Sequence, residues 1–141
     1  MKMHAYVNFP GTCKDALQFY EKHLGGKIVR MSTFDQVPNQ QNIPPGLERS
    51  GVLHARIELG DTILMASDGP KERVQPMRSA YLSLSLDSDA EAERIYNALS
   101  DGGEVFMPME ETFFASRFAQ FRDKFGINWM LIHEKPMPRP A

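Results

Sequence analysis

Apolar and polar residues alternate along several short stretches of the chain, and a period of two predicts β-strands. Such stretches run over residues 4–9, 54–59 and 80–86. Apolar residues recur at helical spacing over residues 16–24 and 92–99, which predicts two amphipathic helices. The fold class expected from this mixture is α+β.

The expected elements occur twice in the same order, which indicates an internal repeat. Thr12 has an acidic residue three positions on, and so does Ser88. Both patterns fit a helix N-cap, in which the side-chain oxygen accepts a free helix N–H. Glycine pairs at 25–26 and 102–103 then end each predicted helix.

A strand, a glycine turn and a second strand follow in each copy, over residues 55–64 and 121–130. Each half therefore reads βαβββ, and the chain is expected to hold two tandem βαβββ units with helices outside mixed sheets. The expected bounds are a single domain over 1–141, a first unit over about 3–68, a second over about 79–134, and a flexible tail over 135–141.

One long connection interrupts the first repeat. Residues 35–51 carry three prolines and many polar side chains. Loops of this length are uncommon in compact domains unless they cover a site or are disordered. The segment is therefore expected to be a long mobile connection.

Strand alternation also separates two faces of each expected sheet. The apolar face should lie under the helix, and the opposite face collects Tyr, Ser, His, Asn and Arg side chains. A duplicated βαβββ pair normally curves this second face into a shared cleft, and a semi-polar lining is typical of a small-molecule pocket. The competing interpretation is a solvated outer face, as in many antiparallel sheets.

Four segments carry a resemblance to a known family, and the resemblance covers the chain from Met3 to His133. They are FPGTCKDALQFYEKHLGG (9–26), LHARIELGDTILMASD (53–68), EETFF (110–114) and DKFGINWMLI (123–132). The chain resembles the vicinal oxygen chelate superfamily of glyoxalase I, extradiol dioxygenases and bleomycin-resistance proteins, and most closely its PhnB-like branch. The resemblance implies a glyoxalase/bleomycin-resistance-like domain and a homodimer.

The resemblance also locates the positions at which metal-dependent members bind a divalent ion. The carboxylate of the last strand falls on Met130, and its first-half counterpart on Leu64 or Met65. The ligand of the fifth strand falls on Tyr81, and that of the first on Ala5, His4 or Tyr6. Thioether and aliphatic side chains cannot replace hard oxygen donors, so a glyoxalase-type metal site is expected to be absent. No cofactor is expected.

Composition narrows the partners further. The chain has 141 residues, 42% of them hydrophobic, with a formal net charge of -2. This balance gives no reason to expect nucleic acid, and the apolar runs are strand-sized, so no membrane span is expected. A single cysteine, Cys13, permits no intrachain disulfide and fits a reducing cytoplasm.

The function expected from these observations is binding of a small organic molecule in a cleft, with Arg56 holding an anionic group. Trp129 is assigned to the core. The expected cleft residues are Tyr6, His54, Arg56, Met65, Tyr81, Glu111, Phe113, Phe114 and Met130.

Two alternatives remain open, and neither the substrate nor catalysis itself follows from the sequence. One is a divalent-metal-dependent lyase, isomerase or dioxygenase with displaced ligands His4, His54 and Glu111. The other is a resistance protein that sequesters a drug-like ligand without turnover.

Overall fold

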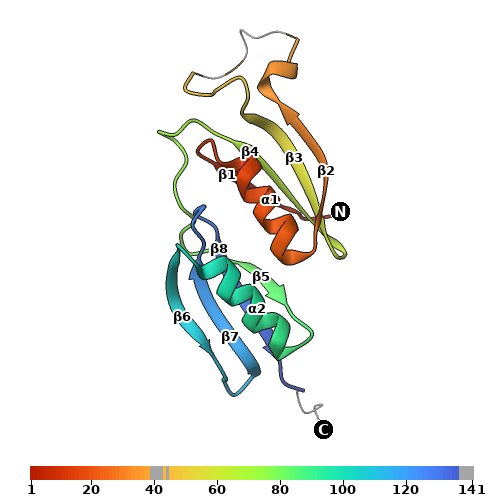
Figure 1. Ribbon diagram of the computed structural model, residues 1–141, viewed down its shortest axis with the longest axis vertical. Helices are drawn as coiled ribbons and strands as arrows, with labels where there is room; N and C mark the ends of the chain where they lie inside the picture. Colours follow the sequence, from red (N-terminus) through yellow and green to blue (C-terminus); the bar gives the residue numbers. More distant parts are fainter. Residues whose placement is uncertain (39–42, 44, 137–141) are drawn as a thin grey trace. The chain divides into compact units, whose positions relative to one another are not determined.

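The computed structural model describes residues 1–38, 43 and 45–136, and in it the chain forms two compact units, Met1–Gln75 and Pro76–Ala141. Each unit is a four-stranded mixed sheet with one helix across one face (Figure 1). The α+β class and the tandem βαβββ units are confirmed. That they act as a single domain stays a prediction, and residues 137–141 of the expected tail lie outside the described residues.

The first unit contains four strands, one helix and a short 3-10 turn. Its sheet has the order β1-β4-β3-β2, with β1 parallel to β4 and the other pairs antiparallel. The elements are β1 (Ala5–Phe9), α1 (Cys13–Leu24), β2 (Lys27–Thr33), η1 (Phe34–Gln36), β3 (Val52–Leu59) and β4 (Thr62–Asp68).

The second unit repeats this topology. Its sheet has the order β5-β8-β7-β6, with β5 parallel to β8 and the other pairs antiparallel. The elements are β5 (Leu82–Ser85), α2 (Asp89–Ser100), β6 (Glu104–Glu110), β7 (Ala115–Arg122) and β8 (Asn128–Glu134).

The helices bury the residues that the 3.6-residue spacing selected. Leu17 and Tyr20 of α1 are fully buried, and so is Leu99 of α2. The sheet residues beneath them are buried as well, and alternation is clear at Ala55 and Ile57 of β3 and at Ala119 and Phe121 of β7. Each fully buried large apolar side chain contributes about 1.5–3 kcal/mol. The opposite face of each sheet, which no helix covers, is called the open face below.

The two helix starts are built differently, and one N-cap prediction is wrong. Ser88 accepts the Glu91 N–H at 3.1 Å, as expected. Thr12 makes no capping hydrogen bond. In its place Asp68, at the end of β4, accepts the Gly11 and Cys13 N–H groups at 3.1 and 2.9 Å.

The DKFGINWM segment (123–130) forms the turn between β7 and β8 and the start of β8. Asp123 is 2% exposed, and its carboxylate accepts the Ile127 N–H at 3.0 Å and the Trp129 indole N–H at 2.8 Å. Gly126 has φ 96°, a left-handed conformation that favours glycine. Trp129 is 1% exposed, which confirms its place in the core. This segment thus holds a hairpin together.

Candidate functional site

The nine residues predicted to line a cleft divide between the two units. Four lie in the first unit: Tyr6, His54, Arg56 and Met65. Five lie in the second: Tyr81, Glu111, Phe113, Phe114 and Met130.

In the first unit, strand register brings all four predicted residues onto the open face. Met65 of β4 pairs with Tyr6 on one side and with Arg56 on the other. His54 lies two residues before Arg56 on β3, and hence on the same face. The Tyr6 Oη lies 3.3 Å from the His54 Nδ1, with ring centroids 5.7 Å apart.

The side chain of Arg56 on this face is only partly satisfied by the chain itself. One terminal guanidinium nitrogen lies 3.8 Å from the Met65 sulfur, a weak acceptor. The Nε atom is buried without a hydrogen-bond partner, and Arg56 makes no ion pair with the described residues. A buried donor without a partner costs about 1–3 kcal/mol, so this geometry suits an acceptor that the chain itself does not supply.

In the second unit, Met130 and Tyr81 belong to an open face rich in aromatic and apolar groups. Met130 pairs with Gln120 and with Ser83. The ring of Tyr81 meets that of Phe106 edge-on, with centroids 6.5 Å apart.

The remaining predicted residues of the second unit lie at the β6–β7 connection. Phe114 packs between Phe113 and Phe118, with centroids 5.2 and 5.1 Å away. Phe113 is 92% exposed. Glu111 accepts a hydrogen bond from the Lys135 Nζ at 3.0 Å, so its carboxylate already has a cationic partner.

The positions at which the resemblance places metal ligands can be compared with the structure. Leu64 is 4% exposed and lies under α1, whereas Met65 lies on the open face. Met65 is therefore the counterpart of Met130. Thioether sulfurs at both positions do not fit a hard divalent ion that prefers carboxylate oxygens. Within the described residues, no group of three His, Cys, Asp or Glu side chains is placed to hold a metal.

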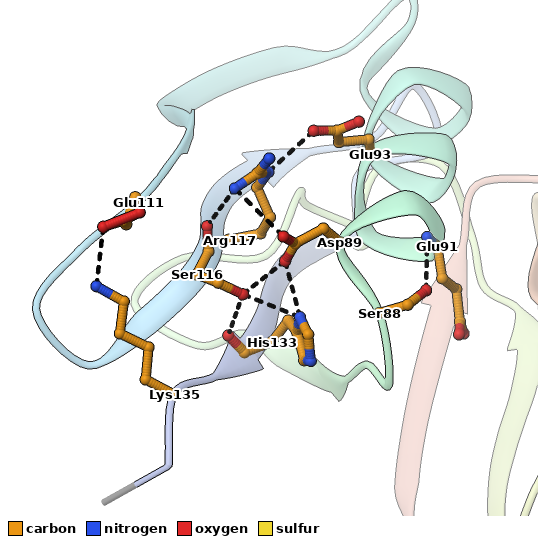
Figure 2. A network of polar contacts seen from close by, with 9 residues as sticks. All are labelled: Ser88, Asp89, Glu91, Glu93, Glu111, Ser116, Arg117, His133 and Lys135. Carbon is orange, nitrogen blue, oxygen red and sulfur yellow. Dashed lines mark hydrogen bonds and ion pairs between the residues drawn. The ribbon is translucent and has the colours of Figure 1, made fainter.

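A polar cluster joins the start of α2 to strands β7 and β8 (Figure 2). The Ser116 Oγ donates to Asp89 Oδ1 at 2.5 Å, and the His133 Nδ1 lies 2.8 Å from the same oxygen and 2.9 Å from Ser116 Oγ. These hydrogen bonds from Ser116 and His133, with the charge of Arg117 nearby, lower the pKa of the Asp89 carboxyl. A Ser-His-Asp catalytic triad uses the two ring nitrogens for separate partners. Here one nitrogen meets both, so the cluster is a structural connection.

Cys13 has no features of a nucleophile. Its side chain is fully buried at the start of α1. Burial, together with the nearby Asp68 carboxylate, raises the pKa of the thiol to about 12. The reactive species of cysteine is the thiolate, so this group is inert near neutral pH.

The structure adds one open-face residue that alternation did not identify. Register between β2 and β3 shifts by one residue, so that Ile28 pairs with Ile57 but Arg30 pairs with Arg56. Val29 is thus the extra residue of a β-bulge. Counting by twos from Ile28 places Arg30 under the helix. The residues themselves contain no local signal that would have revealed the bulge.

A pocket of about 550 Å³ lies elsewhere in the first unit, at the start of α1. It is bounded by the β1–α1 connection, the end of β4 and the segment 46–52. It contains none of the nine predicted residues. Part of the connection over 35–51, which is expected from the sequence to be long and mobile, borders this pocket through residues 46–51. Its residues 39–42 and 44 lie outside the described part of the chain.

These features define the class of protein. Two tandem βαβββ units, each with a helix on one face and an open semi-polar face on the other, are the architecture implied by the resemblance. The chain belongs to the glyoxalase/bleomycin resistance protein/dioxygenase superfamily, whose family model matches residues 2–131.

Individual relatives are similar over nearly the full chain. Protein PA1353 from Pseudomonas aeruginosa is 37% identical, with a TM-score of 0.85 over 96% of this chain and 99% of that one. YjdN of Escherichia coli strain K12 is 28% identical over 98% of this chain and 99% of that protein. A Bacillus cereus PhnB protein, described as a putative 3-demethylubiquinone-9 3-methyltransferase, is 24% identical. It has a TM-score of 0.81 over 94% of this chain and 99% of its own, and shows the shared fold.

Proposed function

We propose that this protein binds a small organic molecule on the open faces of its sheets and that Arg56 holds an anionic group of that molecule. The observation that carries the proposal is the buried Arg56 Nε without a hydrogen-bond partner. Tyr6, 47% exposed, and the ring of His54 offer contact area and hydrogen-bonding atoms beside it. The proposed lining is the set expected from the sequence: Tyr6, His54, Arg56, Met65, Tyr81, Glu111, Phe113, Phe114 and Met130.

We propose further that binding requires no glyoxalase-type metal. The support is the donor chemistry of Met65 and Met130, which suits apolar contact better than coordination of a hard cation. Metal analysis of the purified protein tests this directly. A stoichiometric divalent ion, whose removal by a chelator abolishes an activity, would favour the metal-dependent enzyme with ligands drawn from His4, His54 and Glu111.

The experiment that tests binding is a screen of small organic molecules by protein-observed NMR. Amide and methyl signals of β3 and β4 are expected to shift with saturation for some members of the library. Arg56→Gln is expected to weaken the anionic hits, whereas Arg73→Gln, at an exposed arginine of the same unit, removes the same charge and leaves binding unchanged. A library without any saturable hit on either open face would contradict the proposal.

Two further expectations stay proposals. A homodimer rests on the resemblance to the superfamily, and light scattering during size-exclusion chromatography tests it. A cytoplasmic location rests on the single cysteine, and cell fractionation tests it. In the described residues, no helix is long and apolar enough to span a membrane.

A further inference from the structure

Two arginines lie directly opposite each other on the open face of the first unit. Arg30 of β2 and Arg56 of β3 are cross-strand partners, next to the His54–Ser32 pair. Side chains of paired residues point to the same face and come within about 5.5 Å at their Cβ atoms. Like charges in this arrangement are destabilising unless something of opposite charge lies between them.

The described residues do not supply that opposite charge. No carboxylate of the described chain lies within 4.0 Å of either guanidinium. The nearest acidic residue along β3, Glu58, lies opposite Lys27 and forms no ion pair with Arg56 at that distance. The Arg56 Nε is in addition buried and unpartnered. Besides the Lys27–Glu58 pair, the face thus holds two guanidinium groups with no carboxylate of the described chain within 4.0 Å, and an unused donor.

The β-bulge creates this pairing. In a regular ladder without the bulge, register from Ile28 would place Val29 opposite Arg56 and would send Arg30 to the helix-covered side. Bulges occur preferentially at sheet edges, where β2 lies, and next to active sites, where they re-aim a side chain. Here the bulge brings a second guanidinium to the first.

We propose that Arg30 and Arg56 together form a subsite for an oxyanion, a carboxylate or a phosphate group of an organic ligand, and that Arg30 is a specificity-determining residue. This inference rests on the proposed function of the open face and adds its ligand class. Guanidinium groups donate paired N–H bonds that match the oxygens of both groups. Tyr6 and Met65, beside Arg56, contact the organic part of the ligand.

Three aromatic probes test the subsite: benzoate, phenyl phosphate and uncharged benzyl alcohol. Each is titrated at constant ionic strength against the full chain, with the Arg side-chain Nε–Hε signals followed by NMR. Both anions are expected to bind more tightly than benzyl alcohol, and the ratio of the two anion affinities distinguishes a carboxylate from a phosphate ligand. Arg30→Gln and Arg56→Gln are each expected to weaken the anions about tenfold. Neither substitution should affect benzyl alcohol.

Two further variants test whether the effect comes from the net charge of the unit or from the shape of the guanidinium group. Arg73→Gln removes an exposed charge from the same unit and is expected to leave all three affinities unchanged. Arg56→Lys keeps the charge but loses the planar fork, and is expected to weaken the anions several-fold. A second readout does not depend on the aromatic probes. Inorganic phosphate at constant ionic strength should raise the melting temperature of the wild type and not that of Arg30→Gln.

The outcomes distinguish this inference from the proposed function. Benzyl alcohol binding on the open face, with no preference for anions and no effect of Arg30→Gln, would overturn the subsite and leave the proposed function standing. Equal weakening by Arg73→Gln would overturn it too, because the effect would then be general electrostatics. No binding of any probe, with no phosphate effect on melting, would count against both.

Discussion

At equivalent places on their open faces, the first unit carries Arg30 opposite Arg56 and the second carries Met107 opposite Gln120. Both pairs follow a register shift after a residue whose strand partner is buried, between Ile28 and Arg30 in one unit and between Val105 and Met107 in the other. Both units therefore contain the bulge, but the residues that it brings together differ in chemical character. At this place the first face presents two guanidinium groups and the second a thioether and an amide, while Arg122, two residues after Gln120, forms an ion pair with Glu104.

The paired methionines at the centre of the closing strands are common to both faces. Met65 lies beside Tyr6 and Arg56, and Met130 lies beside Ser83 and Gln120. A flexible, polarisable side chain at both positions suits contact with an organic ligand. The difference between the units therefore concerns the surrounding residues: two arginines without an ion pair to the described residues in the first, and aromatic rings with the Arg122–Glu104 ion pair in the second.

The helix starts also differ in their side chains at equivalent positions of the two units. Three residues after Met65, Asp68 accepts backbone N–H groups at the start of α1. Three residues after Met130, His133 contacts Asp89 at the start of α2. In the first unit, a buried carboxylate ties the closing strand to the start of the helix. In the second, a half-exposed side-chain cluster makes this connection, and Ser88 caps the helix.

The largest expected effect is the loss of the Asp68 carboxylate. Asp68→Ala leaves the buried N–H groups of Cys13 and Val52, bonded at 2.9 Å each, without an acceptor. We expect the free energy of unfolding to fall by about 3–5 kcal/mol. Urea unfolding measures it, with His133→Ala as the matched change in the second unit. An equal or larger loss for His133→Ala would contradict the comparison of the two helix starts.

Much of this architecture can be predicted from the sequence because it depends on the periodic spacing of apolar residues. Alternation identified the buried faces, and helical spacing identified Leu17, Tyr20 and Leu99. The repeat itself is visible in the order of turn and cap residues. The Asp68 cap was missed because a contact across 55 residues leaves no local trace next to Thr12. The same holds for Arg30, since a bulge depends on pairing between strands.

The next largest effect is expected at the turn between β7 and β8, which the Asp123–Trp129 hydrogen bond distinguishes from the turn of the first hairpin. Trp129→Phe removes the indole donor to Asp123 and leaves a void in the core. We expect a loss of about 2 kcal/mol in unfolding free energy, without any change of the open face. The control is Tyr81→Phe, on the open face, which should cost far less. Unchanged stability in Trp129→Phe would show that the indole bond does not hold the hairpin.

A smaller effect of opposite sign is expected at the arginine pair. In buffer without multivalent anions, Arg30→Gln removes a cross-strand repulsion and should raise the unfolding free energy by about 0.2–1 kcal/mol. The matched substitution in the second unit, Met107→Arg, places an arginine opposite the neutral Gln120 and should not introduce this repulsion. Chemical unfolding of both variants measures the contrast. A loss of stability in Arg30→Gln would mean that Arg30 is held by the chain itself.

The smallest expected effect is a dependence on acid at the start of α2. The pKa of Asp89 is lowered on folding from its ordinary value of 3.8. A lowered pKa contributes stability above the ordinary value, and that contribution is lost as pH falls below about 4 and through the folded value. Asp89→Asn should therefore be less stable than wild type at neutral pH, with the difference vanishing in acid. A difference that persists at low pH would contradict this origin.

The central claim is that the bulged pair of arginines on the first open face binds an oxyanion of a small organic ligand. A crystal structure with phenyl phosphate tests it most directly. The account predicts phosphate density between Arg30 and Arg56, within hydrogen-bond distance of both guanidinium groups, with the ring towards Tyr6 and Met65. Phosphate density in the pocket at the start of α1, with the arginine pair unengaged, would contradict it.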